Sequence, residues 1–408
     1  MGGAPEVGKL APEQHALHTC ARVLLQRAGH DDLATALASC VSSERLCDKA
    51  VQQGMLGHLH RLVAGEEELD TDPILVQRVT ERQSVLASRN LRQTAHLVRV
   101  LEELETVGVT AMPYKGPVWA ETLYGDIALR TWIDLDVIVT RDQLGRAREV
   151  LLGIGYVDAD RFNTAFLRRR RGSWGELEFH SPAQGSYVEL HWEVSVSIGS
   201  RPLRAEELLA RSGTVSLLKR TFRAPSWTDA ILIDCIHGAK HEWDRVEQML
   251  GLGLRIEETA GADWPLVVAA AKEAGCMRRV CAGVAHICRV FDLTTPPEIL
   301  DGIAGDSVAR AYVRFLETDS SSGPSKVAGR DLAGLVTRFA TEDSLLASMR
   351  HALIRLFYPG REDWEAFALP SSLRWLYYIL RPGRLALKWS RRLLQSIPGR
   401  FAKAKTPR

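Results

Sequence analysis

The spacing of apolar and polar positions changes twice along the chain. Apolar side chains recur at the helical period over residues 11–107 and again over most residues beyond about 203. Between these regions the apolar runs are short and rich in β-branched residues, which is typical of strands. This order predicts an α+β protein with a mixed β-sheet between large N-terminal and C-terminal helical regions. We therefore expect four parts, at 1–108, 109–200, 201–370 and, as a C-terminal tail, 371–408.

Residues that start or stop helices mark the end of the N-terminal region. Asp72 before Pro73 predicts a helix start, with an N-cap followed by Pro at the first helical position. Leu97 and Leu101 belong to an apolar stripe on this helix, and Gly108 suits the position just after its end.

Two later helix starts are expected from the same kind of signal. Thr140 is expected to cap a helix over roughly 142–152. The Thr228–Asp229 pair is expected to cap a helix that carries His237 and continues to about Trp243.

A short strand and a turn are expected at the start of the central region. Val109–Tyr114 has a strand-like composition, but Pro113 cannot donate to a sheet ladder, so it places this strand at an edge or a bulge. The turn that follows contains Lys115 and Gly116, and Pro117 suits the first turn of a helix.

The stretch Thr131–Thr140 carries two carboxylates in an otherwise apolar strand. Because strand side chains alternate between faces, Asp134 and Asp136 project from one face, while Ile133 and Leu135 project from the other. Two carboxylates about 6–7 Å apart along a strand can converge on divalent metal ions. The alternative is an edge strand with a solvated face.

The composition is that of an ordinary soluble protein. Of the 408 residues, 46% are hydrophobic and 25% are charged, and the net charge of +2 gives no strong nucleic-acid signal for the whole molecule. The seven cysteines form no Cys-x-x-Cys pair, which favours reduced core residues over disulfides or a zinc site. The N-terminus has no apolar signal core and no apolar run approaches 18 residues, so we expect a cytoplasmic protein without a transmembrane segment.

Two more strands and a set of motifs complete the central region. The strands are expected at Glu176–His180 and Tyr187–Glu193, joined by a hairpin loop. The motifs occur in the order Tyr114-Lys115-Gly116, Leu123-Tyr124-Gly125-Asp126, Arg130, Asp134-Leu135-Asp136, Val188-Glu189-Leu190-His191-Trp192, His237-Gly238-Ala239-Lys240-His241-Glu242-Trp243 and Tyr378-Ile379-Leu380-Arg381-Pro382. Together they resemble the uncharacterised bacterial nucleotidyltransferase family over roughly residues 80–385. That family is in turn similar to the DNA polymerase beta-like nucleotidyltransferase superfamily.

This resemblance implies a nucleotidyltransferase-type sheet and the transfer of NMP from an NTP, such as ATP, to an acceptor. Two Mg²⁺ ions roughly 3.5–4 Å apart would neutralise the phosphates, held by hard carboxylate ligands. The resemblance assigns Asp134 and Asp136 to both ions and Glu189 as the third carboxylate. The family usually has Asp at the position of Glu189. Glu178 is the fallback for this role, and a purely structural Glu189 is the remaining alternative.

The resemblance also implies a nucleotide-binding turn at Lys115 and Gly116. Glycine lets the backbone approach the triphosphate, and lysine supplies a cation for the β or γ phosphate. Pro117 departs from the superfamily pattern because it has no backbone N–H to offer. Arg130 has two alternative roles, clamping a phosphate or pairing with a scaffold acid.

Three basic or histidine-containing features carry weaker signals. His237 and His241 have a zinc-ligand spacing, but Gly238 stands where the zincin pattern has Glu, so packing or lining an acceptor pocket is favoured. His191 is expected to support the site or the core, with a direct catalytic role as the alternative. The Arg168–Arg171 run is expected to be a solvated helix end, with triphosphate or RNA binding as the alternative.

The C-terminal segment is basic and amphipathic. Residues 374–408 hold ten Lys and Arg and no acid, and Leu385, Trp389 and Leu393 share one helix face. This pattern has three explanations: peripheral contact with an anionic membrane, packing on the protein itself with a free basic tail, or contact with nucleic acid.

The sequence thus predicts a Mg²⁺-dependent nucleotidyltransferase. No motif identifies its acceptor, which can be a small molecule, a peptide, a protein or RNA. The alternative from another class is a catalytically inactive nucleotide-binding or adaptor protein of the same fold, which Glu189, Pro113 and Pro117 favour. A third hypothesis is an enzyme that nucleotidylates tRNA or protein.

Overall fold

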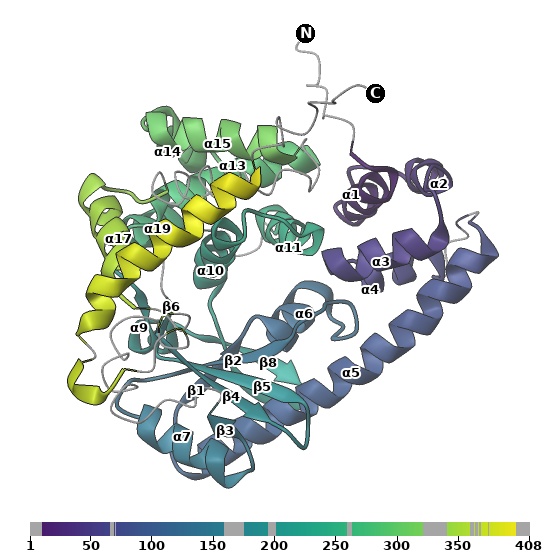
Figure 1. The fold of residues 1–408 in the computed structure, drawn as a ribbon. Coiled ribbons are helices and arrows are strands. Elements are labelled where there is room, and N and C mark those ends of the chain that lie inside the picture. Colours follow the sequence, from purple (N-terminus) through teal and green to yellow (C-terminus); the bar gives the residue numbers. More distant parts are fainter. Residues whose placement is uncertain are drawn as a thin grey trace, which may run out of the picture.

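The computed structural model describes residues 10–65, 69, 71–158, 175–194, 201–258, 263–320, 341–359, 363, 366, 369–373 and 375–396. A small mixed sheet lies between helical regions, so the predicted α+β class is confirmed (Figure 1). A single cluster of buried apolar residues extends from Ala16 to Leu316. The Arg168–Arg171 run lies outside the described residues.

Five helices precede the sheet: α1 (Pro12–Leu24), α2 (His30–Ala38), α3 (Ser43–Gln53), α4 (Leu56–Val63) and α5 (Pro73–Thr106). The start of α5 is confirmed, because the Asp72 carboxylate accepts a hydrogen bond from the backbone N–H of Ile74 at 3.0 Å. The apolar stripe that includes Leu97 and Leu101 is buried, also as predicted. Gly108 follows the helix with a φ of 72°, which glycine adopts without strain.

The sheet has the strand order β1-β2-β5-β4-β3. Its strands are β1 (Ala111–Tyr114), β2 (Asp134–Val139), β3 (Val157–Asp158), β4 (Glu176–Ser181) and β5 (Ser186–His191). The β2–β5 pair is parallel, and the other three pairs are antiparallel. Pro113 lies in the edge strand β1, as its missing N–H predicted. The hairpin between β4 and β5 is confirmed.

Helices cover the sheet from two sides. Figure 1 shows α5 and α7 (Leu144–Gly153) below the sheet and α6 (Gly116–Tyr124) above it. Contacts agree with this view, because α5 touches β1 and α7, while α6 touches β1 and β2. Leu135 and Val137 of β2 are fully buried, which leaves the carboxylates of this strand on its other face.

Short strands connect the sheet to the C-terminal helices. They are β6 (Glu193–Val194), β7 (Leu203–Arg204), β8 (Gly213–Leu217) and β9 (Arg220–Ala224), with α9 (Ala205–Ala210) between β7 and β8. The β8–β9 hairpin packs beside β1 and α6. The side of the sheet that carries α6 is therefore further enclosed.

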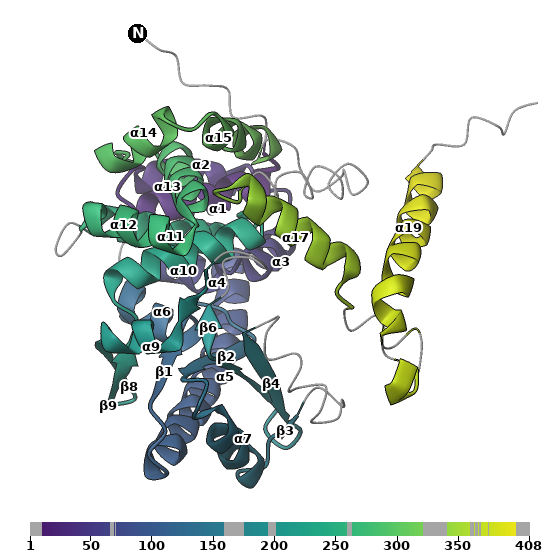
Figure 2. The same cartoon turned by 90° about the vertical axis from the view of Figure 1, so that its left-hand side faces the viewer.

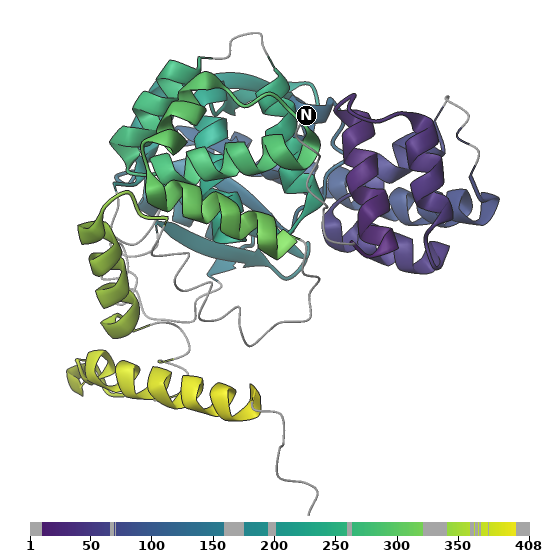
Figure 3. The same ribbon diagram turned by 90° about the horizontal axis from the view of Figure 1, so that it is seen from above.

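The C-terminal helices are α10 (Trp227–Lys240), α11 (Val246–Glu257), α12 (Trp264–Ala274), α13 (Met277–Phe291), α14 (Pro297–Ala304), α15 (Ser307–Ser320), α17 (Leu345–Phe357) and α19 (Leu376–Ser396), with the 3-10 helix η1 (Ser371–Leu373) before α19. Seen from above, α10–α15 form a bundle beside α1–α4, while α17 and α19 lie at its edge (Figure 3). No helix among the described residues combines the length and the apolar character needed to cross a membrane. All seven cysteines are free, and six of them are buried.

Two predicted helix starts are wrong. Thr140 does not cap α7, because a turn in which the Gln143 N–H bonds to the Thr140 carbonyl at 3.1 Å comes first, and the helix begins at Leu144. The cap of α10 is Ser226 rather than Thr228–Asp229, since the Ser226 hydroxyl accepts a hydrogen bond from the Asp229 N–H at 3.2 Å.

Two further details of the predicted elements need correction. The helix α10 ends before Trp243, because Glu242 and Trp243 adopt positive φ angles of 56° and 54° that a helix cannot accommodate. Ile133 does not belong to the buried strand face, because β2 begins only at Asp134 and the Ile133 side chain is exposed.

Candidate active site

The parallel pairing of β2 and β5 brings the three predicted carboxylates together. Asp136 lies opposite Glu189, and Asp134 lies opposite Tyr187. Residues paired across adjacent strands project from the same face of a sheet, so all three carboxylates share one face. The β2–β5 pairing joins segments about fifty residues apart in sequence, which the alternation within each strand could not reveal.

His191 stands at the centre of this acidic face. Its Nε2 lies 3.0 Å from an oxygen of Asp136 and 3.2 Å from an oxygen of Glu189. Each of the three side chains offers one ligand atom, and these atoms lie within 4.8 Å of one another. Within the described ranges, no other group of three or more His, Cys, Asp and Glu side chains is arranged to hold a metal ion.

The electrostatics of the site follow from burial and close charges. Burial, and then the charges of Asp136 and Glu189, raise the pKa of Asp134 to about 6. Burial alone would raise the pKa of Asp136, but the nearby Lys115 and His191 cations hold it well below its usual value. Burial alone would lower the pKa of His191, but hydrogen bonds to Asp136 and Glu189 raise it to about 9. The site therefore holds a charged imidazolium among carboxylates at neutral pH.

Lys115 reaches the same carboxylate from the β1–α6 turn. Its ammonium group donates a hydrogen bond to Asp136 at 3.0 Å and lies 4.8 Å from the centre of the Tyr114 ring. The backbone of Lys115 has φ 53° and ψ −147°, and Gly116 follows with φ 35°. A non-glycine residue in this region is strained, so the fold holds Lys115 in place against a backbone cost.

Glu176 also lies beside the acidic face, a position that the sequence motifs do not predict. It lies opposite His191 on β4, with a carboxylate oxygen 3.6 Å from the Nδ1 of His191. Burial raises the pKa of Glu176. Glu178, the predicted fallback, lies opposite Glu189 and is exposed. The spacing of Glu176 and Glu178 predicts that both lie on one face of the strand. Only the β4–β5 register shows which of them contacts His191.

Polar residues of α5 support the loop that leads into β2. The Asn90 amide donates hydrogen bonds to the carbonyls of Ile127 at 2.8 Å and Arg130 at 2.7 Å. Gln83, two helical turns earlier, donates to the carbonyl of Ala128 at 2.8 Å. Asn90 is fully buried, so these bonds satisfy its donors and fix the position from which β2 starts.

Arg130 pairs with an acid, one of its two predicted roles. Its Nε donates a hydrogen bond to Glu247 of α11 at 2.8 Å, and both side chains are buried. The Tyr124 hydroxyl donates to the same carboxylate oxygen at 3.1 Å. The guanidinium also lies 3.5 Å from the carbonyl oxygen of Gly116, so Arg130 helps to hold the Lys115–Gly116 turn in position.

A pocket opens beside Lys115 between α6, α10 and α11. Its walls include Trp119, Asp234 and His237. The indole N–H of Trp119 donates to Asp234 at 2.6 Å, and the Asp234 carboxylate also accepts from Arg255 at 2.8 Å. Burial, and then the charge of Lys115, hold the pKa of His237 well below its usual value, so this imidazole is neutral. This agrees with the expectation that His237 packs or lines a pocket.

The chain also matches a known family. Residues 39–292, more than half of the chain, match the family described as "Uncharacterised nucleotidyltransferase". This range includes both strands of the acidic face, the Lys115–Gly116 turn and the pocket beside it. No curated protein matches the chain.

Proposed function

The chain belongs to the uncharacterised nucleotidyltransferase family, and from this premise we propose that it moves NMP from an NTP to an acceptor hydroxyl, with pyrophosphate as the leaving group. The observation that carries the proposal is the pairing of Asp136 with Glu189 on one face of the sheet, with His191 within hydrogen-bonding distance of both carboxylates. In this proposal residues 109–200 form the catalytic core, and the helical regions 1–108 and 201–370 complete the substrate pockets.

The donor set fits a divalent cation such as Mg²⁺. Asp136 and Glu189 offer hard carboxylate oxygens, which are the ligands that Mg²⁺ prefers. Burial and neighbouring acids raise the pKa of Asp134, so a nearby cation would stabilise the charged form of this carboxyl. Asp134, Asp136 and Glu189 would hold two ions, and bound Mg²⁺ would neutralise the triphosphate and favour in-line displacement at the α-phosphorus.

The remaining side chains orient the reactants and move one proton. Lys115 would contact the β or γ phosphate, and Gly116 would let the backbone approach it. Arg130 would contribute to nucleotide binding by holding the carbonyl side of this turn. Glu189 would accept the proton of the acceptor hydroxyl. The hydroxyl oxygen would at the same time bond to the α-phosphorus, and the bond from that phosphorus to pyrophosphate would break. His191 would hold Glu189 and Asp136 in a fixed relative position.

Calorimetry with ATP, GTP, CTP and UTP, each with and without Mg²⁺, tests this proposal. The wild type is compared with an Asp134→Asn/Asp136→Asn variant and with a matched control, Asp31→Asn/Asp48→Asn, whose carboxylates are exposed on α2 and α3. We expect Mg²⁺-dependent binding of at least one NTP by the wild type and the control, and none by the site variant. Metal-independent binding that persists in the site variant would contradict the proposed site.

Pyrophosphate release then separates transfer from binding. The acceptor classes to be offered are small hydroxyl compounds, peptides, proteins and tRNA, each with the NTP that binds. Glu189→Gln is expected to abolish pyrophosphate release, while Glu189→Asp, the residue usual in the family, is expected to retain part of it.

A second candidate is a nucleotide-binding or adaptor protein of the same fold that lacks catalysis. The observation that favours it is the engagement of Asp136 by two cations, Lys115 and His191, each at 3.0 Å. Mg²⁺ would have to compete with both for this carboxylate. This candidate predicts NTP binding without pyrophosphate release for any acceptor, and metal-dependent labelling of one acceptor rules it out.

A further inference from the structure

The segment that contains α17, η1 and α19, here called the C-terminal arm, exposes many large apolar side chains. Leu345 and Leu346 of α17 are 78% and 77% exposed, and Ile379 of α19 is 62% exposed. Figure 2 shows the two helices side by side at the edge of the molecule, and contacts between them confirm this. Single exposed apolar residues are ordinary, but a cluster of this kind indicates an interaction surface.

The exposed residues of α17 form a stripe. Leu345, Met349, Leu353 and Phe357 are all exposed and follow one another at intervals of four residues. Residues four apart lie on the same face of a helix, so these side chains form one apolar edge.

Several apolar side chains of α19, among those that the structure describes, face outward. The buried side of this helix carries Tyr377, together with Arg381 and Arg384, which both pair with the buried carboxylate of Asp363. Ile379 and Leu387 of the same helix, by contrast, are exposed. A helix that faces water normally turns its charged residues outward and its apolar residues inward. The exposed apolar residues of the arm are therefore suited to contact with a partner surface.

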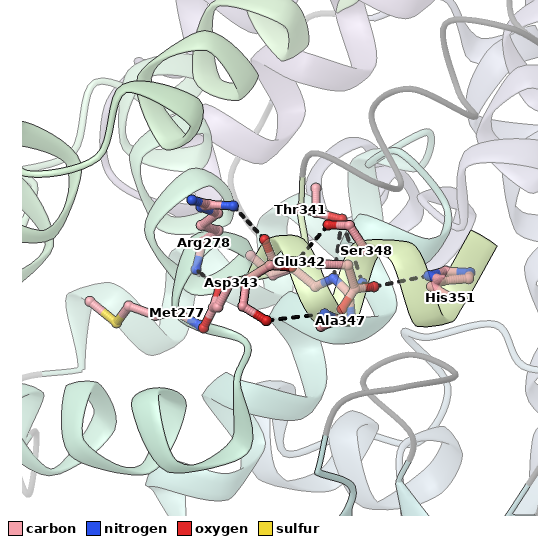
Figure 4. Close-up of polar contacts among 10 residues, drawn as sticks. Met277, Arg278, Thr341, Glu342, Asp343, Ala347, Ser348 and His351 are labelled. Atoms are coloured by element: carbon pink, nitrogen blue, oxygen red, sulfur yellow. Dashed lines mark hydrogen bonds and ion pairs between the residues drawn. The ribbon is translucent and has the colours of Figure 1, made fainter. Parts of the chain in front are cut away.

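Buried polar contacts fix the root of the arm (Figure 4). The Asp343 carboxylate accepts hydrogen bonds from the backbone N–H groups of Met277 at 2.7 Å and Arg278 at 2.9 Å, which begin α13. Glu342, fully buried, pairs with Arg279 at 2.8 Å and with His351 of α17 at 3.0 Å. These contacts hold the start of α17 against the helical bundle, so they fix the position of its apolar edge.

Charge is divided unevenly between residues 366–408 and the rest of the chain. Residues 366–408 contain ten of the 52 Lys and Arg and none of the 50 Asp and Glu, which leaves a net charge of −8 on residues 1–365. An anionic surface therefore attracts the C-terminal region and repels the remainder. Such a surface would orient the molecule with the arm toward it.

We propose that the C-terminal arm docks on an anionic lipid membrane, with the exposed apolar residues of α17 and α19 in the interface and with attraction to the lipid from the basic composition of residues 366–408. Apolar insertion and attraction to anionic lipid are the two contributions that hold amphipathic helices at a membrane surface. The proposal goes beyond nucleotidyl transfer and does not depend on it. It also chooses among the three explanations of the basic C-terminal segment.

Vesicle sedimentation of the full-length protein tests the proposal. Vesicles of phosphatidylcholine mixed with phosphatidylglycerol are compared with vesicles of phosphatidylcholine alone. The arm variant is Leu353→Glu/Ile379→Glu, at exposed positions whose substitution leaves the core intact. The matched control is Val85→Glu/Leu91→Glu, which makes the same charge change at exposed apolar positions of α5.

We expect the wild type and the control to sediment with the anionic vesicles only, and the arm variant to bind about tenfold more weakly. Added salt should weaken the binding of the wild type. Equal binding by the arm variant and the control overturns the proposal, and so does the absence of binding by the wild type. Light scattering supplies a further check, because a wild-type dimer that the arm variant alone disrupts, without vesicle binding, would make the arm an interface between two copies of the chain.

Discussion

The ammonium group of Lys115 and the carboxylate of Asp136 form an ion pair of 3.0 Å, with side chains that are only 19% and 3% exposed. The pair forms because Tyr114 lies opposite Asp136 across β1 and β2, and Lys115 is the next residue. The proposed phosphate-binding turn and the proposed metal-binding strand are thus connected directly. A change at either residue is expected to affect both sites.

Asp136→Asn is expected to lower the affinity for Mg²⁺ about a hundredfold or more. It should also lower the free energy of unfolding by about 2–3 kcal/mol, because Lys115 and His191 lose a shared buried anion. Calorimetry and urea unfolding measure the two effects. Asp48→Asn, which removes an exposed partner of Arg82, is the control and should change stability by less than about 1 kcal/mol. An Asp136→Asn protein with wild-type Mg²⁺ affinity would exclude Asp136 as a ligand.

The backbone strain at Lys115 leads to a second prediction. Lys115→Ala and Lys115→Gly both remove the ion pair, but glycine alone adopts φ 53° and ψ −147° without strain. The glycine variant is therefore expected to be more stable than the alanine variant by about 1 kcal/mol or more in urea unfolding. Both variants should bind NTP more weakly than the wild type. Equal stability of the two variants would show that the turn stores no strain.

The charged state of His191 predicts a specific pH dependence. Its pKa rises from 6.5 to about 9 on folding, so the stabilisation is fully present below pH 6.5 and is lost as the pH rises through 9. The free energy of unfolding should fall by on the order of 3 kcal/mol more in the wild type than in His191→Gln over this interval. Urea unfolding of both proteins at a series of pH values measures the difference. If the free energies of unfolding of the two proteins changed with pH in parallel, His191 would not be charged in the folded protein.

The buried pair of Arg130 and Glu247 is expected to matter more than any surface pair. Glu247→Ala leaves a buried guanidinium without its carboxylate and should lower the free energy of unfolding by about 3 kcal/mol. Glu44→Ala removes a half-exposed partner of Arg78 and Arg82 and should cost less than about 1 kcal/mol. Thermal or urea unfolding compares them, and similar losses in the two variants would argue against a structural role for the buried pair.

Much of the local structure could be predicted because its causes are local. The cap at Asp72, the glycine after α5, the edge position of Pro113 and the hairpin between β4 and β5 all depend on neighbours within a few residues. At Thr140 the helix begins later and without a side-chain cap, whereas at Thr228 the nearby Ser226 is the cap instead. The choice between such competing caps depends on how the preceding turn approaches the helix.

The arrangement of the candidate site could be predicted only in part, because part of it depends on contacts between distant segments. Alternation along β2 placed Asp134 and Asp136 on one face, because side-chain period is a property of a single strand. The contact of Glu176 with His191 and the exposure of Glu178 depend on the register between β4 and β5. Sequence spacing contains no information about that register.

The sequence by itself determined the class of fold, the strand that carries the paired acids and the family to which the chain belongs. The tertiary structure alone decided that Asp136 meets His191 and Lys115, that Glu247 partners Arg130, and that Ile379 and Leu387 of α19 are exposed. Periodicity and capping act between residues a few positions apart, so they can be read along a chain. Ion pairs between distant segments form only after packing has brought those segments together and removed their water.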